Sequence, residues 1–483
     1  MGSSQLSGHH YVTHTTLARE QTAVCRMTRA QALIAVSLIG LLVVGLIRQW
    51  HPTLVWLVTL VTLLYGLDLL FNCFLVYRSF FRPVEIKITP EQLTAKRKWP
   101  RYTIFCPLYK EVAVLPQFIL AISQLDYPKN RLEVLLLLEE DDTLTIEAVR
   151  AMTLPNYFQV LVVPDSRPKT KPKACNFGLA HATGEYAVIY DAEDIPERDQ
   201  LKKAVLAFGQ VKPQVYCLQA KLNYYNIHQN LLTRLFTLEY SLWFDLILTG
   251  LQATSAPIPL GGTSNHFRTA NLRELEGWDP FNVTEDADLG MRIAKRGQAT
   301  AILDSTTMEE ANSQVKNWLK QRSRWIKGYM QTYLVHMRRP REMARTSVWH
   351  VVALQLVIGG KVASMLFNPF LWVLTIAYFA LKPLVGGFIE SLYIAPIYYL
   401  GLFSLVIGNF LYMYYYMMGA ARRGQWDLMA YALLVPAYWV MMSLAAFYAM
   451  WELIVRPYHW NKTKHGLHLD QEKQRQEAEA LVS

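Results

Sequence analysis

The stretch Tyr186-Ala-Val-Ile-Tyr-Asp-Ala-Glu-Asp194 joins a short apolar run to a cluster of acids. A continuous apolar run of this length is typical of a strand that is buried on both faces of a parallel sheet. Four similar runs precede or follow it, and amphipathic stretches lie between several of them. We expect strands at residues 102–106, 133–138, 159–163, 186–190 and 215–218, and helices at 112–123, 174–182 and 200–208. This alternation predicts an α/β domain with a largely parallel sheet.

Polar residues follow four of these strands. Pro107-Leu-Tyr-Lys-Glu111 and Glu139-Glu-Asp-Asp142 follow the first two, and a basic loop with Lys169, Lys171 and Lys173 follows the third. Each acidic cluster, taken alone, is explained by an ordinary solvated loop. Ligands of open α/β sheets, however, bind beyond the carboxyl ends of the strands. Alternating acids and bases at one edge suit a nucleotide diphosphate with a divalent cation.

The acids of residues 191–194 form the candidate metal site. Asp191 and Glu193 alternate along extended backbone, so both side chains point to the same side. Such a pair can hold Mg²⁺ or Mn²⁺ between two phosphates. Asp194 follows directly, and the sequence leaves open whether Glu193 or Asp194 is the second ligand.

Thr284-Glu285-Asp286 supplies the candidate catalytic acids. One interpretation is structural, since Thr and acidic residues favour the start of a helix, expected here at 287–295. The other interpretation is chemical. A carboxylate beside a metal and diphosphate can take the proton of an attacking hydroxyl, which makes Asp286 a candidate general base.

Gln321-Arg-Ser-Arg-Trp325 follows some 35 residues later. Arg324 can stabilise a leaving diphosphate, and Trp325 offers a flat face for a sugar ring. An amphipathic helix at a membrane interface would also explain an arginine and a tryptophan here.

The composition indicates a membrane protein. Hydrophobic residues make up 52% of the 483 residues and charged residues only 18%, against roughly 25% charged in average globular proteins. This excludes a purely soluble and a disordered protein. The net charge of +10 arises largely from residues that flank long apolar runs, which is typical of cytoplasmic membrane flanks. We therefore expect no nucleic-acid binding. The five cysteines show no zinc or disulfide spacing.

The ordered set of motifs between apolar segments resembles the family 2 processive glycosyltransferases, which include cellulose, hyaluronan, chitin and mannan synthases. The resemblance implies a GT-A (Rossmann-like) domain on the cytoplasmic face and a helical transmembrane bundle of five to six spans with interface helices. The expected division is a tail at 1–30, a transmembrane hairpin at 31–78, an interfacial linker at 79–99, the GT-A domain at 100–345, an interface helix and C-terminal bundle at 346–455, and a tail at 456–483.

The resemblance also implies roles for particular residues. Asp286, with Glu285 beside it, would be the catalytic base, and Asp191 with Glu193 or Asp194 would hold Mg²⁺ or Mn²⁺. The residues expected to contact the donor or the acceptor are Pro107, Tyr109, Glu111, Glu140, Asp141, Asp142, Lys171, Lys173, Asp191, Thr263, Ser264, Asn265, Gln321, Arg324 and Trp325.

By this resemblance the protein would polymerise a nucleotide sugar, most simply a UDP-hexose, into a β-linked polysaccharide and export it across the cell membrane. Its partners would be the growing polysaccharide, the lipid bilayer and accessory subunits or further copies of the chain. Two alternatives stay open: a single-transfer enzyme that acts on a polyprenyl phosphate or ceramide, and a non-catalytic subunit that binds glycan or nucleotide sugar.

Overall fold

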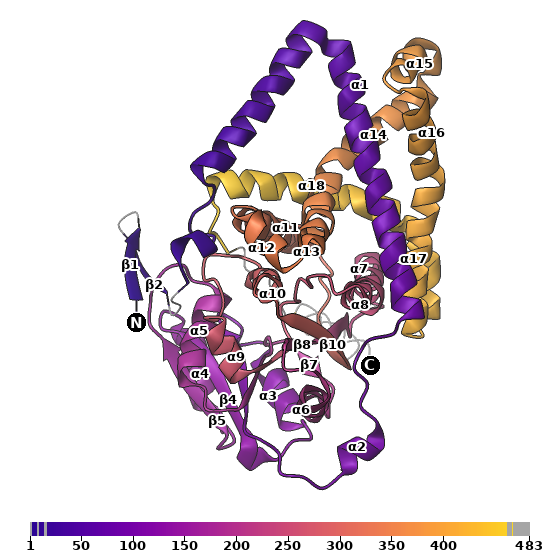
Figure 1. Ribbon diagram of the computed structural model, residues 1–483. Helices are drawn as coiled ribbons and strands as arrows, with labels where there is room; N and C mark the ends of the chain where they lie inside the picture. The colour runs from indigo at the N-terminus through magenta and orange to yellow at the C-terminus, as the bar shows by residue number, and fades with distance from the viewer. Residues whose placement is uncertain (1, 7–8, 14–16, 461–465, 467–483) are drawn as a thin grey trace, which may run out of the picture.

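An eight-stranded mixed sheet forms the centre of the α/β domain, in the order β5-β4-β3-β6-β9-β8-β10-β7. The computed structural model describes residues 2–6, 9–13, 17–460 and 466 (Figure 1). The five strands expected from the sequence are all present. The strands are β3 (Tyr102–Leu108), β4 (Leu132–Glu139), β5 (Phe158–Val163), β6 (Tyr186–Ile189), β7 (Ile195–Pro196), β8 (Val215–Tyr224), β9 (Asn265–Arg268) and β10 (Ala299–Glu309).

The sheet is less parallel than the sequence predicts. Strands β3, β4, β5 and β6 are parallel, as are β8 and β10, but β9 runs antiparallel between β6 and β8, and β7 is antiparallel to β10. The four residues of β9 are Asn265-His-Phe-Arg268, which carry no apolar run. The expected parallel α/β sheet is therefore corrected to a mixed one.

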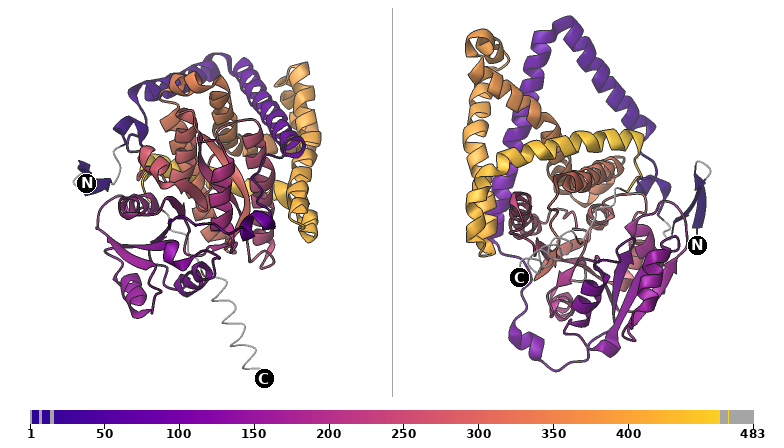
Figure 2. Two further views of the ribbon diagram at one scale, coloured as in Figure 1. Left: turned by 60° about the horizontal axis from the view of Figure 1, so that its bottom comes forward. Right: turned by 180° about the vertical axis from the view of Figure 1, so that it is seen from behind.

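Alternate residues of the central strands enter two separate cores. Ile104 and Leu136 pack on one side of the sheet, and Phe105 and Leu135 pack on the other, as the two-residue period of a strand requires. Helices cover both faces (Figure 2). They are α3 (Leu115–Ser123), α4 (Thr143–Ala151), α5 (Lys171–His181), α6 (Gln200–Gln210), α9 (Thr269–Glu274) and α10 (Glu285–Lys295).

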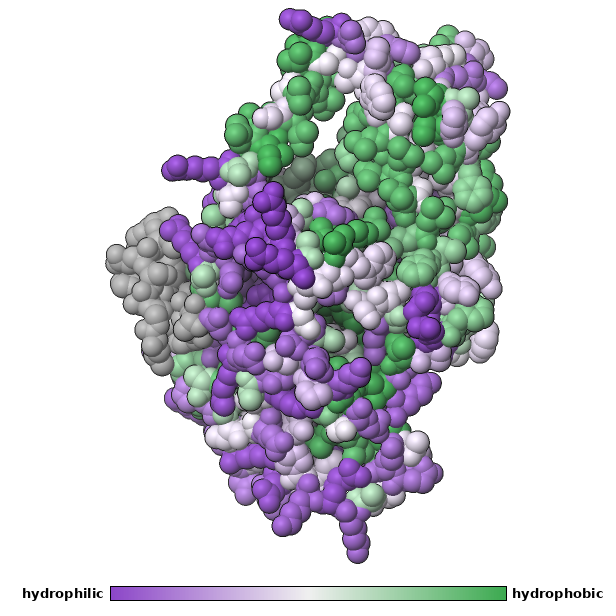
Figure 3. Space-filling view, in the orientation of Figure 1, coloured by the Kyte–Doolittle hydropathy of each residue, from purple (hydrophilic) through white to green (hydrophobic). Residues whose placement is uncertain are grey.

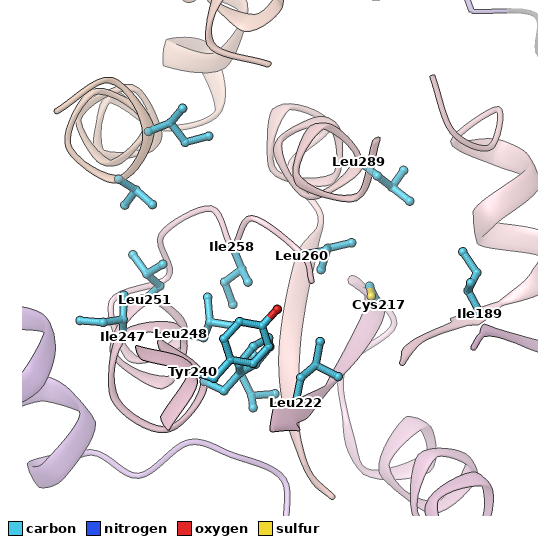
Figure 4. Close-up of a cluster of buried hydrophobic side chains, with 14 of the residues drawn as sticks. Ile189, Cys217, Leu222, Tyr240, Ile247, Leu248, Leu251, Ile258, Leu260 and Leu289 are labelled. Carbon is cyan, nitrogen blue, oxygen red and sulfur yellow. The ribbon is translucent and has the colours of Figure 1, made fainter. Parts of the chain in front are cut away.

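One core continues from the sheet into the helical part. Figure 4 shows Tyr240 between Leu222 of β8 and Leu248, and all three are buried. Tyr240 belongs to α7 (Leu231–Leu242), which continues through a π-helical turn (Trp243–Ile247) into α8 (Leu248–Ala253). A Cβ at Gly250 would lie 2.4 Å from the Leu75 carbonyl oxygen, so only glycine lets α8 approach the first long helix this closely.

The described residues contain four helices that are long and apolar enough to cross a bilayer. The first, α1 (Arg29–Phe81), bends at Gln49, where φ is −145° and ψ is 63°, just before Pro52, and its two arms diverge from this bend (Figure 1). The remaining long helices are Val348–Ala380, Ala395–Arg422 and Trp426–Val455. Their exposed apolar side chains gather on the half of the molecule opposite the α/β domain (Figure 3).

These helices are built from shorter elements. The region at 346–455 was expected to begin with an interface helix, and in the structure one continuous helix runs from Val348 to Ala380. The elements are α13 (Val348–Leu354), a π-helical turn (Gln355–Gly360), α14 (Lys361–Ala380), α15 (Lys382–Ser391), α16 (Ala395–Phe403), a π-helical turn (Ser404–Gly408), α17 (Asn409–Arg422), a 3₁₀ segment (Trp426–Leu434) and α18 (Val435–Val455).

Helix α18 runs across the direction of α1 and α17 (Figures 1 and 2). It packs on α11 (Val315–His336) through a row of small residues, where Ala445 and Ala449 contact Ile326 and Met330. A short helix, α12 (Pro340–Thr346), joins α11 to α13, and α2 (Pro90–Thr94) lies in the expected linker.

The structure describes part of each of the two expected tails. Strands β1 (Gly2–Leu6) and β2 (His9–Thr13) pair, and a 3₁₀ turn (Arg19–Gln21) precedes α1. Ala23 is only 3% exposed, so the part of the tail next to α1 packs on the domain. In the C-terminal tail, residues 456–460 contact α11, whereas 461–465 and 467–483 lie outside the described residues, as does residue 14.

Candidate active site

A cavity of about 290 Å³ lies at the carboxyl ends of the strands, between the sheet and helices α10 and α11. It brings together most of the motifs, although they are spread over more than two hundred residues. The predicted site residues that line it are Pro107, Tyr109, Glu111, Lys171, Asp191, Glu193, Glu285, Asp286, Gln321, Arg324 and Trp325.

Lys171 lines the cavity from the start of α5. Its Nζ lies 2.5 Å from Asp191 Oδ1 and donates to the Gly262 carbonyl oxygen at 2.6 Å. Burial opposes the charged form, but the carboxylates of Asp191 and Glu285 outweigh it and raise the pKa of Lys171. The side chain is therefore a fixed cation, which suits a phosphate.

Glu285 and Asp286 begin α10. Burial raises the pKa of both carboxyls, most clearly for Glu285, which also faces the charge of Asp286. The Ala287 N–H donates to Asp286 Oδ1 at 2.8 Å. A Cβ at Gly262 would lie 3.5 Å from Asp286 Oδ2, so the glycine loop faces this carboxylate. A raised carboxyl pKa is what a general base that works near neutral pH needs.

Helix α11 fixes the loop that carries these acids. The Val283 N–H donates to Gln331 Oε1 at 3.1 Å, and Asn282 Nδ2 donates to Thr332 Oγ1 at 2.9 Å. A Cβ at Gly328 would meet Thr284 Oγ1 at 2.3 Å, so the loop touches the helix where no side chain intervenes. Thr284 makes no side-chain cap bond. Capping by this threonine therefore does not explain the motif.

The two arginines of the Gln321–Trp325 motif differ. Arg322 donates to both carboxylate oxygens of Glu239 and is thereby neutralised. Arg324 interacts electrostatically with Glu285 and Asp191. Its Nε has no hydrogen-bond partner among the described residues. Its guanidinium stacks 4.3 Å from the ring centre of Trp460. Arg324 is thus the arginine that can bind an incoming anion.

Of the three candidate metal ligands, Asp191 and Glu193 line the cavity. Asp194 is 1% exposed, and its Oδ2 accepts from the Asp191 N–H and the Thr263 hydroxyl. Asp194 therefore shapes the turn. No set of three or more His, Cys, Asp or Glu side chains able to bind a metal occurs among the described residues. Two carboxylates nevertheless fit Mg²⁺ or Mn²⁺, because magnesium commonly binds through one or two carboxylates together with substrate phosphates.

Four predicted residues near the nucleotide edge have other positions. Lys173 is fully buried, pairs with Glu139 at 2.6 Å and does not line the cavity. Asp142 accepts from the Lys110 N–H at 2.5 Å and the Thr145 N–H at 3.3 Å, which makes it the N-cap of α4. Two further acids lie at the exposed rim, outside the cavity lining: Glu140 accepts from the Asp165 N–H, and Asp141 pairs with Lys169.

The expected acceptor-side loop also needs correction. Thr263, Ser264 and Asn265 are at most 1% exposed and do not line the cavity. Their side chains bond to the Ile189 carbonyl, the Thr307 hydroxyl and the Gly261 carbonyl respectively. The backbone of Gly261 and Gly262 faces the cavity in their place.

Several residues that line the cavity were not predicted from the sequence motifs. Glu309 ends β10, a strand that was not expected, and Glu139 is the first acid of the cluster at 139–142 but was not among the predicted contact residues. A second cavity of about 210 Å³ extends between the long helices. Both cavities are lined by Glu239, Trp243, Lys361, Met365 and Met442. These residues lie singly on apolar helices, so no motif marks them.

Comparison with known proteins places these observations in a family. Residues 100–328 match the model of the glycosyltransferase like family 2. The probable glycosyltransferase YdaM of Bacillus subtilis is 27% identical over 57% of this chain and 64% of its own length. Glucomannan 4-beta-mannosyltransferase 7 of Arabidopsis thaliana is 26% identical over 48% of this chain and 43% of its own length. The chain thus spans less than two thirds of either relative.

Among solved structures, the mannosyltransferase PcManGT from Pyrobaculum calidifontis in complex with GDP-Man and Mn²⁺ aligns with 83% of this chain and 99% of its own, at 20% identity and a TM-score of 0.49. The family match covers the whole set of motifs, from Pro107 to Trp325. Residues 100–328 therefore match a family 2 glycosyltransferase domain, built here on a mixed sheet with helices on both faces.

Proposed function

We propose that the protein is a membrane-integrated, inverting glycosyltransferase that polymerises a nucleoside diphosphate hexose into a β-linked polysaccharide. The observation that carries this proposal is the pair of cavities that share Glu239, Trp243 and Lys361. A chain that grows at Asp286 would pass from the first cavity into the second, which lies between the long helices. The plant relatives named as glucomannan mannosyltransferases also support a polysaccharide product.

The residues of the first cavity have different roles in the proposed reaction. Asp286 takes the proton of the acceptor hydroxyl, and the freed oxygen forms its bond to the anomeric carbon as the bond to the diphosphate breaks. Because attack and departure occur on opposite faces, an α-linked donor yields a β-glycoside. Lys171 and Arg324 stabilise the charge that develops on the leaving diphosphate. Asp191 and Glu193 would hold Mg²⁺ or Mn²⁺, which supplies further neutralisation of the diphosphate.

The second cavity favours a neutral glycan over a lipid phosphate. Two acids, Asp68 and Glu239, face a single base, Lys361, so the lining offers no excess of positive charge for an anion. The rest of the lining is rich in hydroxyl, amide and aromatic groups, which suit sugar rings. These residues include Tyr65, Asn72, Ser364, Asn368, Ser404, Asn409, Tyr412, Tyr415, Tyr416, Tyr438 and Trp439.

We expect a polymeric product when the full-length protein, purified in detergent, is given UDP-glucose, UDP-N-acetylglucosamine or GDP-mannose with Mg²⁺ or Mn²⁺. One donor should release nucleoside diphosphate and form a polymer that a linkage-specific β-glycosidase digests. Extraction with organic solvent separates lipid-linked sugars. A product that consists only of short, lipid-linked sugars would contradict the proposed synthase. If none of these donors releases nucleoside diphosphate, the proposed transfer reaction is contradicted.

We also propose a four-span arrangement, with the GT-A domain cytoplasmic. The two arms of α1, helix α14 and the helix Ala395–Arg422 would cross the membrane, while α18 lies across them at the interface. An even number of spans keeps residues 17–28 and 456–460 on the side of the domain, where both contact it.

A reporter fusion tests this topology. Alkaline phosphatase fused after residue 392, between α15 and α16, should be active because it reaches the outer side. The same enzyme fused after residue 460 should be inactive, whereas green fluorescent protein at that point should fluoresce. Phosphatase activity at residue 460 would mean that α18 crosses the membrane.

A further inference from the structure

Two segments from opposite ends of the chain meet at the loop that delivers the catalytic acids. We call residues 19–27 the arm and residues 456–460 the strap. The Ala23 N–H donates to Asp279 Oδ2 at 2.6 Å, and the Phe281 N–H donates to Asp279 Oδ1 at 3.0 Å. Asp279 is 0% exposed. One buried carboxylate therefore joins the arm to the first turn of the loop at 279–284.

The far end of α11 fixes the course of the arm. The guanidinium of Arg338, just after the helix, donates to the main-chain carbonyls of Glu20, Thr22 and Cys25, at 3.0 Å for Thr22. Ala23 packs in a small apolar cluster with Phe281 and Val335. Since three bonds from one planar fork hold an irregular segment in a single path, the Ala23 N–H stays aimed at Asp279.

The strap completes the arrangement. The Tyr458 hydroxyl donates to the Val24 carbonyl at 2.6 Å, and its ring lies 5.7 Å from that of Phe281. Gln331 Nε2 donates to the Pro457 carbonyl at 3.1 Å, while its Oε1 accepts from the Val283 N–H. The arm, the strap and α11 thus hold the loop at both its ends, directly before Glu285.

We propose that the arm is a positioning element for catalysis and that Asp279 is its positioning residue. The inference rests on the proposed role of Asp286, which follows the loop by two residues. Without the arm, a buried carboxylate oxygen of Asp279 loses its donor, a state that folded proteins avoid. The loop then relaxes toward other donors. A displacement of about 1 Å at a reacting group can lower a rate by roughly 100-fold.

The test compares Ala23→Pro, which removes the N–H, with Ala23→Gly, which keeps it. We expect kcat for nucleotide release by the full-length enzyme to fall about 10- to 100-fold in Ala23→Pro, with the KM for the donor unchanged, and to stay near wild type in Ala23→Gly. Arg338→Lys should resemble Ala23→Pro, whereas Arg341→Lys, at an exposed arginine three residues on, should behave as wild type.

Amide hydrogen exchange of residues 279–284 in the same variants reads the loop without any substrate. We expect faster exchange in Ala23→Pro and wild-type exchange in Ala23→Gly. Unchanged exchange in Ala23→Pro overturns the positioning role whether or not the enzyme turns over a sugar. Faster exchange with unchanged kcat overturns it as well, because the arm would then order the loop without serving catalysis. Absence of polymer from the wild-type enzyme, with exchange in the variants as expected, would contradict the proposed product and leave the positioning role intact.

Discussion

Asp286→Asn should lower kcat by about 10²- to 10⁴-fold, the contribution typical of a general base, while nucleotide binding persists. The amide keeps the size of the carboxylate and can still accept the Ala287 N–H, so the start of α10 is preserved. It cannot take a proton from the acceptor hydroxyl. Nucleotide release measures the rate, and calorimetric titration with the nucleoside diphosphate measures binding.

The pH dependence of the rate follows from the role of Asp286 as a base. A base acts in its deprotonated form, so the rate is full above its pKa and falls as the pH drops through it. Burial raises the pKa of Asp286 above the ordinary aspartate value of 3.8. The acid limb of the wild-type profile should therefore lie above that value, toward neutral pH.

Two controls test the assignment of Asp286 as the general base. Glu147→Gln changes an exposed acid of α4 and should leave both the rate and the profile unchanged. Asp286→Asn should also remove the acid limb from whatever slow reaction remains. An asparagine variant that retains wild-type kcat, or one that keeps the same limb, would assign the base to another group.

The sequence predicted the strands and the motifs better than it predicted individual side chains. The apolar runs of β3, β4 and β6 are long enough to identify, and the carboxyl ends of parallel strands meet at one edge. Lys171 and Lys173 show that a motif does not predict where each of its side chains points. Residues two apart on a helix point to different sides, so Lys171 faces Asp191 in the cavity while Lys173 is buried against Glu139.

Other residues were missed because their roles depend on the tertiary structure. Asp142 looks like one more acid of a cluster, yet it caps α4. Glu239 and Lys361 are single charges on apolar helices, and they become candidate site residues only because α7 and α14 both line the two cavities. Ala23 carries no signal at all, since its contribution is a main-chain N–H that reaches Asp279 across 256 positions.

Chelation of divalent metal should abolish transfer, and Mg²⁺ or Mn²⁺ should restore it. The charges of the cavity give the reason. Its lining contains eight acids and five bases. The acids are Glu111, Glu139, Asp191, Glu193, Glu239, Glu285, Asp286 and Glu309, and the bases are Lys169, Lys171, Arg322, Arg324 and Lys361. A nucleotide diphosphate adds further negative charge. Burial and the neighbouring Asp191 already raise the pKa of Glu193, which shows how poorly the acids tolerate one another without a cation.

Variants of the three adjacent acids separate the ligands from the turn. Asp191→Asn and Glu193→Gln should each raise the Mn²⁺ concentration needed for half-maximal rate and lower the saturated rate by at least about 100-fold. Asp194→Asn should instead lower the melting temperature with the Mn²⁺ requirement unchanged, because Asp194 bonds to the Asp191 N–H and to Thr263. Asp165→Asn, at an exposed acid of the basic loop, is the matched control. Transfer that survives chelation would leave the diphosphate to Lys171 and Arg324 alone, and an altered Mn²⁺ requirement in Asp194→Asn would make that residue a ligand.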